Sequence, residues 1–481
     1  MQHIPHPLPR AWRTWLTPSR RALITCAFTG AGLLAGGCAG ISGEGVAARE
    51  SGVVAAFVLA SADGQPQARV LTRRPACPSI DIDGRATPMS VRAAAGDEAL
   101  RAGPQSDVKP ASFPVLTCEL ALPANARQAK VGGRALALPA PTVNRIVVIG
   151  DTGCRLKLSD GKFQACRDSA AWPFAAIARQ AAATKPDLVI HVGDYHYRES
   201  PCNTGDTGDA GCAGSPWGYG YDAWAADFFE PARPLLAAAP WVFVRGNHET
   251  CARAGQGWFR WFDHAPWTAQ RSCNLAQLDH EADYSAPYGV PLGGGTQLLV
   301  FDSGKSSEQS YAPDEPAYAR YLQQFTELDR LAARAPHNFF LSHHPVLGFA
   351  PGKNGPPKAA ALGLASVMRT LHGDALFAPG IDVALHGHVH LFEAISFATG
   401  QAATLIMGNG GSIKAHALGA ELATTSSPWA HTRVAQAVSN DSFGFAMLER
   451  AGANWNITEF DQHGQAMLHC TLAGKDLTCV P

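Results

Sequence analysis

The sequence predicts an α/β protein in which short buried strands alternate with helices. Short continuous apolar runs, such as residues 145–149 and 187–192, are typical of buried strands. Longer segments with helical character separate the runs, for example residues 172–184 and 316–335. Polar motifs begin where the apolar runs end. Because α/β sheets bind their ligands at the carboxyl ends of strands, this arrangement predicts a functional site on the connecting loops.

The expected elements of the main domain, residues 141–481, can be given in chain order. The helix at residues 172–184 has Pro173 in its first turn, where proline is favoured. The other expected elements are strands at 145–149 and 187–192, a largely helical segment at 221–238, strands at 241–244 and 297–301, a helix at 316–335, and strands at 338–341, 381–385 and 404–407. Residues 415–442 have no clear pattern, and a long functional loop fits their length.

Residues 51–140 differ because helical periodicity is hard to find in them. They contain short apolar runs, such as residues 53–59, and closely spaced turn residues, such as Asp83-Gly84. We expect a small β-rich N-terminal domain, with Pro-Ala-Pro at residues 139–141 as the hinge into the next domain. A lid over the substrate, a carbohydrate-binding module and a packing domain all fit this segment.

Residues 1–37 are predicted to be an export signal. Four arginines precede an apolar run at residues 22–35, which is too short to span a membrane comfortably. Residues 19–24, Ser-Arg-Arg-Ala-Leu-Ile, are similar to a twin-arginine signal. Residues 34–38, Leu-Ala-Gly-Gly-Cys, resemble a bacterial lipoprotein box, which would place a lipid on Cys38 ahead of a tether at residues 38–50. Cleavage without lipid is the alternative, so a periplasmic, lipid-anchored or secreted protein is expected.

The cysteines fit an oxidising compartment. Twelve are present, and ten remain after Cys26, in the signal, and Cys38 are set aside. These ten fall into pairs that are close in sequence, namely Cys77/Cys118, Cys154/Cys166, Cys202/Cys212, Cys251/Cys273 and Cys470/Cys479. Local disulfides are the simplest interpretation, although sequence alone does not fix connectivity. A structural zinc site is disfavoured because no Cys-x-x-Cys occurs.

The bulk composition is that of a globular protein, and it limits the partners. The chain has 481 residues, 46% hydrophobic and 16% charged, with a formal net charge of −1. A nucleic-acid partner usually requires a basic face or stripe, and nothing in the sequence indicates one.

Five short polar motifs follow expected strands. They are Gly-Asp-Thr-Gly at 150–153, Gly-Asp-Tyr-His-Tyr at 193–197, Gly-Asn-His-Glu at 246–249, Phe-Leu-Ser-His-His-Pro at 340–345 and Gly-His-Val-His at 387–390. Each alone is a common turn. Together they offer enough oxygen and nitrogen ligands for two metal ions, and a mixture of imidazole and carboxylate suits first-row metals such as Fe, Zn or Mn.

These residue types match the chemistry of phosphoryl transfer. Two metals about 3.5–4 Å apart clamp a phosphoryl group, and a metal lowers the pKa of bound water from about 15.7 to about 7. A bridging ligand needs two usable oxygens, which Asp provides. The leaving alkoxide needs a proton donor, and His is the usual residue.

The order of these motifs resembles that of the calcineurin-like metallophosphoesterase superfamily. The tyrosine three residues after the second Asp, Tyr197, is similar to the purple acid phosphatase branch. The resemblance covers roughly half of the chain. It implies a layered β-sandwich flanked by helices, and hydrolysis of phosphate monoesters by a metal-bound hydroxide.

The resemblance also implies a ligand set for two metal ions bridged by Asp194. The ligands of a ferric ion would be Asp151, Tyr197 and His390. The ligands of a divalent ion, which could be Fe, Zn or Mn, would be Asn247, His343 and His388. In that family a tyrosinate–iron(III) bond gives a purple colour.

The resemblance implies a further role for His248, as the acid that protonates the leaving group, with Glu249 orienting it. The two other outer-sphere histidines found in parts of the family have no matching motif. His196, His264 and His344 are nearby candidates, so the substrate pocket stays undefined. Tyr195 is expected to pack rather than to bind metal.

Three alternatives remain. A phosphodiesterase or nucleotidase with two divalent metals would leave Tyr197 merely packed near the site. A non-catalytic binding module would keep the metal fold without turnover. A two-lobed aspartic protease would use Asp151 and Asp302, which both lie in apolar-Asp-Thr/Ser-Gly segments, but it would leave the histidine motifs unexplained.

Overall fold

The structure is a computed structural model that describes residues 52–97, 111–203, 210–352, 356–418, 422 and 427–480. The predicted export signal, Cys38 and the tether lie outside these residues. Residues from Gly43 to Pro481 cluster into one compact unit. Among the described residues, no helix has both the length and the apolar character needed to span a membrane.

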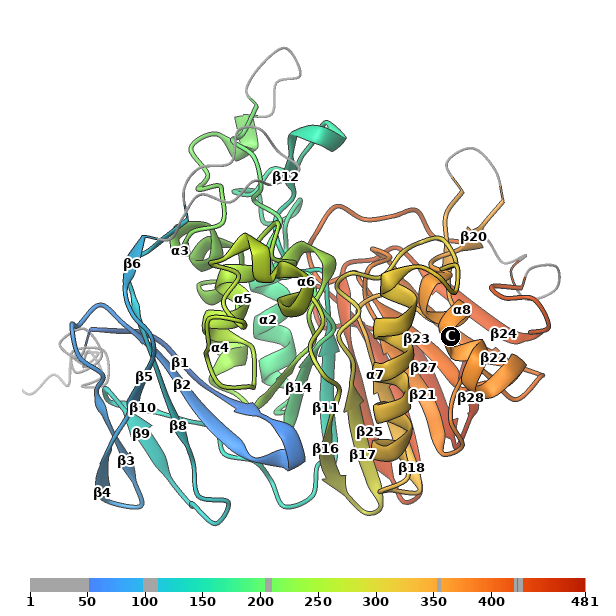
Figure 1. The fold of residues 1–481 in the computed structure, drawn as a ribbon, viewed down its shortest axis with the longest axis horizontal. Coiled ribbons are helices and arrows are strands. Elements are labelled where there is room, and N and C mark those ends of the chain that lie inside the picture. Colours follow the sequence, from blue (N-terminus) through green and yellow to red (C-terminus); the bar gives the residue numbers. More distant parts are fainter. Residues whose placement is uncertain are drawn as a thin grey trace, which may run out of the picture. The chain divides into compact units, whose positions relative to one another are not determined.

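Two large mixed sheets form the centre of this unit (Figure 1). The first has eleven strands in the order β28-β27-β26-β25-β11-β14-β15-β1-β2-β8-β5. Their bounds are β28 Asp476–Val480, β27 Ala466–Ala473, β26 Asn454–Asp461, β25 Gly444–Ala451, β11 Arg145–Ile149, β14 Leu188–His191, β15 Trp241–Phe243, β1 Val53–Ala60, β2 Pro66–Thr72, β8 Leu116–Ala121 and β5 Ser90–Ala93.

The second sheet has seven strands in the order β16-β17-β18-β21-β23-β22-β24. Their bounds are β16 Tyr288–Gly293, β17 Thr296–Val300, β18 His337–Leu341, β21 Ile381–His386, β23 Ala403–Met407, β22 Phe392–Phe397 and β24 Val434–Asn440. In the middle of each sheet the strands are parallel: β11, β14, β15 and β1 in the first, and β17, β18, β21 and β23 in the second.

The two sheets pack face to face, and helices cover their outer faces. Val148 and Ile190 of the first sheet share one buried apolar cluster with Phe339 and Leu385 of the second. The helices that pack on the first sheet include α2 Phe174–Ala183, α3 Tyr221–Trp224, α4 Arg233–Leu236 and α5 Gly255–Trp261. Those on the second are α7 Pro316–Ala332 and α8 Gly363–His372. The predicted sandwich flanked by helices is therefore confirmed.

The predicted elements of the main domain agree with the structure to within a few residues, with one exception. The segment at 221–238 is not one helix but α3, a π-helical stretch at Ala225–Phe229, and α4. Pro231 and Pro234 interrupt it, because proline lacks the N–H that a helix interior needs. Several further elements were not predicted: the strands β16, β22 and β24 to β28, and the helices α5, α6 Asp279–Ala282 and α8.

The N-terminal region is β-rich, as predicted. Its strands β1, β2, β8 and β5 continue the eleven-stranded sheet, since Leu59 of β1 pairs with Trp241 of β15. A separate four-stranded sheet comprises β10 Arg134–Ala135, β9 Ala129–Val131, β3 Ser79–Ile82 and β4 Arg85–Pro88. Residues on the two sides of the expected boundary at residue 140 thus share one sheet.

All five predicted cysteine pairs form disulfides. The Cys154–Cys166 bridge closes a hairpin of β12 Leu156–Lys157 and β13 Lys162–Phe163. Two further two-stranded antiparallel sheets pair β19 Phe349–Ala350 with β20 Lys358–Ala359, and β6 Gly96–Asp97 with β7 Ser112–Phe113. Five disulfides indicate an exported protein from an oxidising compartment.

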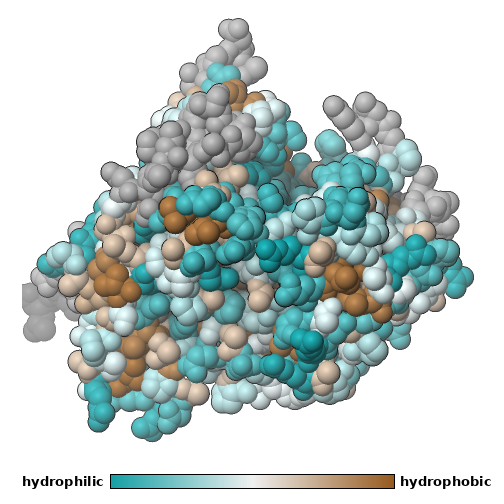
Figure 2. Space-filling model, viewed as in Figure 1, coloured by the Kyte–Doolittle hydropathy of each residue, from teal (hydrophilic) through white to brown (hydrophobic). Residues whose placement is uncertain are grey.

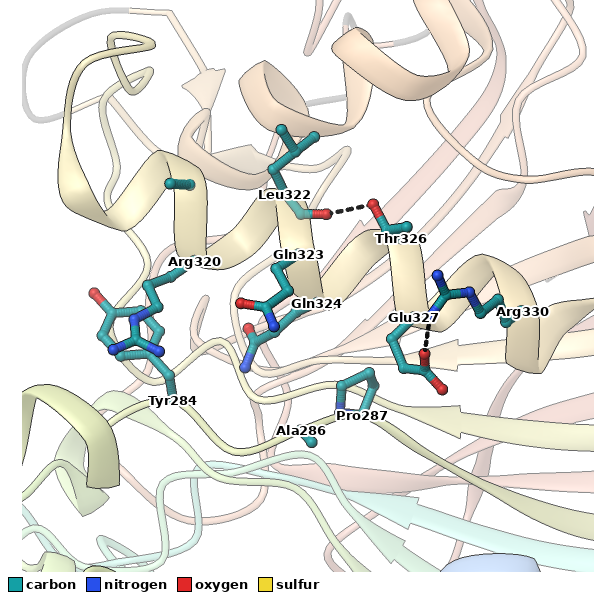
Figure 3. Close-up of a pocket in the computed structure, with 11 residues that line it drawn as sticks. Tyr284, Ala286, Pro287, Arg320, Leu322, Gln323, Gln324, Thr326, Glu327 and Arg330 are labelled. Carbon is teal, nitrogen blue, oxygen red and sulfur yellow. Dashed lines mark hydrogen bonds and ion pairs between the residues drawn. The ribbon is translucent and has the colours of Figure 1, made fainter.

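On the face in Figure 2, hydrophilic residues predominate and brown apolar groups are separated from one another. A pocket of about 640 Å³ lies between α7 and the loop that precedes β16. Figure 3 shows Arg320 beside Tyr284 in this pocket, and Glu327 paired with Arg330. None of the predicted metal ligands lines it.

Two buried arginines tie the N-terminal strands to α5. Arg69 of β2 donates to the carbonyl oxygens of Trp261, at 3.0 Å, and Asp263, at 3.3 Å. Arg92 of β5 donates to the carbonyl oxygens of Phe259, at 2.8 Å, and Asp263, at 3.1 Å. The last carbonyls of a helix have no partner within the helix, so the two guanidinium groups complete the C-terminal end of α5.

We expect Arg92→Met to lower the free energy of unfolding by about 1–3 kcal/mol, because it leaves the buried carbonyl oxygen of Phe259 without its donor, while Glu119 keeps its pair with Arg69. The matched control is Arg330→Met on the surface, where an exposed pair with Glu327 is worth at most about 1 kcal/mol. Denaturant unfolding of the disulfide-intact proteins measures both. Equal, small losses in the two variants would show that the Arg92 contacts are dispensable.

Candidate metal centre

The polar motifs meet because parallel strands bring their carboxyl ends together. Asp151 follows β11, Asp194 follows β14 and Asn247 follows β15, which are neighbours in the first sheet. His343 follows β18 and His388 follows β21, which are neighbours in the second. Since the sheets face each other, the loops from both converge on one site.

Three of these residues have a left-handed backbone. The φ angles are 54° at Asp151, 59° at Asp194 and 71° at His388. Non-glycine residues rarely adopt this conformation, and it occurs often at functional sites. Each chain turns sharply as it leaves its strand, which aims the side chain into the space between the sheets.

One half of the site is formed around the phenol oxygen of Tyr197. This oxygen lies 2.9 Å from Asp151 Oδ1, 2.8 Å from His390 Nε2 and 2.8 Å from Asp194 Oδ2. His390 Nε2 is also 3.3 Å from Asp151 Oδ1. Two carboxylates, a phenol and an imidazole therefore share one small volume.

The other half is formed around the amide oxygen of Asn247. Asn247 Oδ1 lies 3.1 Å from His343 Nε2 and 3.2 Å from His388 Nδ1. His343 Nε2 is in turn 3.2 Å from Asp194 Oδ2. The Asp194 carboxylate thus lies between the two halves, with one oxygen close to ligand atoms of both.

The orientation of the imidazoles leaves nitrogen atoms free for metal. His343 Nδ1 is 2.9 Å from the carbonyl oxygen of Val192, and His390 Nδ1 is 2.6 Å from that of Ile413. Metal-binding histidines usually use one nitrogen in such a hydrogen bond, which presents the other to the metal. In both residues the free nitrogen is Nε2, which faces the cluster.

The electrostatics of the site require positive charge. Burial, and then the carboxylates of Asp151 and Asp194, raise the pKa of Tyr197 well above its usual value. Burial alone would raise the pKa of Asp194, but His343 and His248 hold it well below its usual range. Burial alone would lower the pKa of His343, yet Asp194 raises it to about 9. Because buried anions are costly unless paired or bound to metal, this donor set fits metal cations.

Ligand atoms of Asp151, Asp194 and His343 lie within 4.8 Å of one another, so these three residues could hold a metal ion. Tyr197, Asn247, His388 and His390 lie in contact with this group. All seven predicted metal ligands are therefore brought together, and their individual roles stay a prediction.

His248 lies at the edge of the cluster and is held by Glu199, a residue that the sequence analysis missed. His248 Nδ1 is 2.6 Å from Glu199 Oε1 and 3.1 Å from the carbonyl oxygen of His196. Arg253 Nε donates to Glu199 at 2.9 Å. Burial, and then Arg253, lower the pKa of His248 to about 3, while Asp194 and Glu199 oppose this shift. In the sequence, the only hint of this role is that Glu199 lies two residues after Tyr197, in the same loop.

Glu249 does not contact His248, which corrects the expectation that it orients this histidine. Its carboxylate accepts hydrogen bonds from the backbone N–H groups of Asp194 at 3.0 Å, Tyr195 at 2.9 Å and Gly246 at 3.1 Å. Burial, and then the charge of Asp194, raise the pKa of Glu249 to about 8. Glu249 therefore holds the Asp194 loop in its left-handed turn.

Of the other candidate histidines, one lies beside the cluster. The ring of His344 is 4.3 Å from that of His388. The ring of His196 packs instead against Trp224, and that of His264 packs against Tyr288. Tyr195 is fully buried among aromatic side chains, as expected.

Asp302 has a structural role. It pairs with the buried Arg245 at 3.3 Å and accepts a hydrogen bond from the N–H of Ser285 at 2.9 Å. An aspartic protease needs two carboxylates that share a proton, whereas Asp302 is engaged with a guanidinium. The protease alternative therefore has no support in the structure.

The comparisons with known proteins agree with this geometry. Residues 144–392 match the model of the calcineurin-like phosphoesterase family, and the chain belongs to this family. It is a phosphoesterase, a hydrolase of phosphate esters. A search of curated proteins finds no match.

Solved structures show a similar fold at low identity. One named PhoD is 12% identical, with a TM-score of 0.52, and the match covers 89% of this chain and 92% of that one. A purple acid phosphatase from seeds of yellow lupin (Lupinus luteus) is 14% identical, with a TM-score of 0.49, over 87% of this chain and 74% of that one. At these identities the likeness to PhoD concerns the fold alone.

We expect Gly246→Ala to impair metal binding. A Cβ at Gly246 would overlap the carboxylate and backbone nitrogen of Asp194, so the central carboxylate would have to move. Displacing a group that supports metal ligands costs about 10–100-fold in metal affinity. Metal content after dialysis, determined by mass spectrometry, tests this.

The matched control is Gly96→Ala, where an added methyl meets no described atom within 4 Å. A Gly246→Ala protein with wild-type circular dichroism and full metal content would show that Asp194 need not occupy its present position.

Proposed function

We propose that this chain hydrolyses phosphate monoesters at a centre of two metal ions, a ferric ion and a divalent ion of Fe, Zn or Mn. The observation that carries the proposal is the position of Asp194 Oδ2, which lies 2.8 Å from Tyr197 Oη and 3.2 Å from His343 Nε2. A carboxylate between two groups of ligands is what a pair of metals needs as a bridge.

The proposed ligand sets follow the two halves of the site. Asp151, Tyr197 and His390 would hold the ferric ion, since a phenol and a carboxylate are hard anionic ligands. Asn247, His343 and His388 would hold the divalent ion, with a neutral amide and two imidazoles. When bound, two such metals polarise the phosphoryl oxygens and lower the pKa of water.

The chain itself supplies positioning and a proton at the leaving group. We assign the proton donor to His248, whose Nε2 faces the cluster at 3.8 Å from Asp194 Oδ2. Glu199 fixes the ring through Nδ1 and, with Asp194, favours the imidazolium form against burial and the Arg253 charge, which lower the pKa of His248. Arg253 neutralises Glu199, so that the buried carboxylate does not require a further cation.

The setting of the reaction is proposed to be outside the cytoplasm. The five disulfides support export. Whether the protein is periplasmic, secreted or anchored through a lipid on Cys38 depends on residues 1–51, which lie outside the described part of the chain. A small phosphate ester is the expected partner.

The first test compares initial rates on an aryl phosphate monoester and the matching diester, with protein loaded with iron and zinc or manganese. We expect faster turnover of the monoester, and His248→Ala should lower kcat by about 10²–10⁴-fold with metal content unchanged, since it removes only the proton donor. Glu199→Gln should lower kcat less, because the ring remains.

A preference for the diester would assign the chain to the phosphodiesterase alternative and keep the metal centre. Wild-type kcat in His248→Ala would rule out the proton-donor role. Absence of turnover on both esters, with two metals bound, would instead favour the binding-module alternative.

The iron assignment has a spectroscopic test. If Tyr197 binds Fe(III) as a phenolate, the purified protein should show a broad visible charge-transfer band. We expect Tyr197→Phe to abolish this band, because phenylalanine has no oxygen to bind iron. Tyr195→Phe, a buried neighbour away from the cluster, is the control and should keep it. An active, iron-containing but colourless wild type would exclude the phenolate.

A further inference from the structure

A pocket of about 240 Å³ opens beside the candidate metal centre, and its lining includes His388 and His390. Its charged lining consists of Arg155, Lys162, Lys358, Lys414 and Glu308. We call the part formed by the four cations the basic pocket. The rest of the lining is apolar or backbone, including Ala350, Pro351 and Ile413.

The charges of the basic pocket do not cancel. Lys358 pairs with Glu308 at 3.4 Å, and both side chains are more than half exposed. Arg155 pairs with Asp160. Among the described residues, neither Lys162 nor Lys414 has a carboxylate partner within 4 Å. A cleft with an excess of one charge concentrates ligands of the opposite charge, so the basic pocket favours anions.

A disulfide-bonded hairpin positions Arg155. The Cys154–Cys166 disulfide closes the β12–β13 hairpin, which carries both Arg155 and Lys162. The hairpin is anchored on the Tyr197 loop, because Leu156 N–H donates to the Tyr197 carbonyl oxygen at 3.0 Å. As a result the Arg155 guanidinium lies over the Tyr197 ring, 5.4 Å from its centre.

One donor of Arg155 is unused. Its Nε is buried and has no hydrogen-bond partner among the described residues. A buried donor without an acceptor is costly, and guanidinium groups bind phosphate oxygens well. The position of this group over Tyr197 places the unused donor at the border between the metal centre and the basic pocket.

Lys414 is fixed on the other side of the pocket. It follows Ile413, whose carbonyl oxygen accepts the hydrogen bond of His390 Nδ1 at 2.6 Å. Its ammonium lies 4.9 Å from the centre of the Phe443 ring. Lys414 is therefore the next residue after the one that holds the His390 ring, which keeps its charge close to the candidate metal centre.

From this geometry we infer that the substrate is a phosphate monoester that carries at least one further phosphate group. The inference rests on the proposed function: the reacting phosphate would occupy the metal centre, and the second phosphate would bind in the basic pocket. Lys162 and Lys414 have no anion of their own within the described chain, and a second phosphate would supply it. An aryl phosphate would leave these cations unused.

The test compares kcat/KM for fructose 1,6-bisphosphate and fructose 6-phosphate with the metal-loaded protein. We expect kcat/KM to be about tenfold or more higher for the bisphosphate, because its second phosphate would form two additional ion pairs with the lysines. The double variant Lys162→Gln/Lys414→Gln should lose most of this preference. Added salt should reduce the preference in the wild type, because it screens the exposed lysines.

The matched control is Lys130→Gln, an exposed lysine on β9 that does not line the pocket. It should keep the wild-type preference. Equal kcat/KM for the two sugars in the wild type, or a preference that the double variant retains, would overturn the inference while leaving phosphate monoester hydrolysis intact.

Calorimetry separates this failure from that of the proposed function. The metal-loaded protein is titrated with methylenediphosphonate, which is not hydrolysed, and separately with inorganic phosphate as the reference. If no ester is turned over, the proposed function fails, but tighter binding of the diphosphonate that the double variant loses would still support the basic pocket. Equal affinity for both anions would overturn the pocket as a phosphate subsite.

Discussion

The structure around the candidate site depends on keeping the Asp194 carboxylate buried and central. A buried carboxylate is stable only with hydrogen bonds and opposite charge. The backbone N–H of His248 donates to Asp194 Oδ1 at 2.9 Å, and His343 lies against Oδ2. Three further features keep the carboxylate in this position: the left-handed backbone of Asp194, the hydrogen bonds from its loop to Glu249, and the glycine at position 246. The sandwich of two sheets brings the ligands of both halves to it.

The N-terminal strands extend this rigid framework to His248, the proposed proton donor. Arg69 and Arg92 hold the C-terminal end of α5, and α5 begins six residues after Glu249. The Cys251–Cys273 disulfide lies in the same segment. The turn that carries Asn247 and His248 is therefore fixed by β15 on one side and by α5 on the other. The contacts of Arg69 and Arg92 fit the packing domain, one of the three roles that the sequence left open for residues 51–140.

Local patterns in the sequence were sufficient for the central strands of both sheets and for the polar motifs that contain the candidate ligands, whose individual roles came from the family resemblance. Continuous apolar runs marked β11, β14 and β18, and polar motifs at their ends identified Asp151, Asp194 and His343. Contacts between distant segments could not be read in the same way. Nothing in residues 53–60 shows that β1 pairs with β15, and the role given to Glu249 belongs to Glu199, because the backbone turns Glu249 towards the Asp194 loop. The apolar pattern at 221–238 predicts one helix, but Pro231 and Pro234 break it.

The candidate metal centre and the basic pocket are built in different ways, and under the proposed function this difference would separate the reaction from the choice of substrate. The candidate metal ligands lie at the ends of core strands, where a shift of one residue would disturb both sheets. Lys162 and Lys414 are exposed residues at the rim, where a substitution changes charge with little effect on packing. Cys154–Cys166 gives the hairpin that carries Lys162 the rigidity that a surface hairpin of a few residues lacks by itself. Under these proposals, the disulfide-bonded rim would select the charge of the substrate, and the buried centre would carry out the reaction.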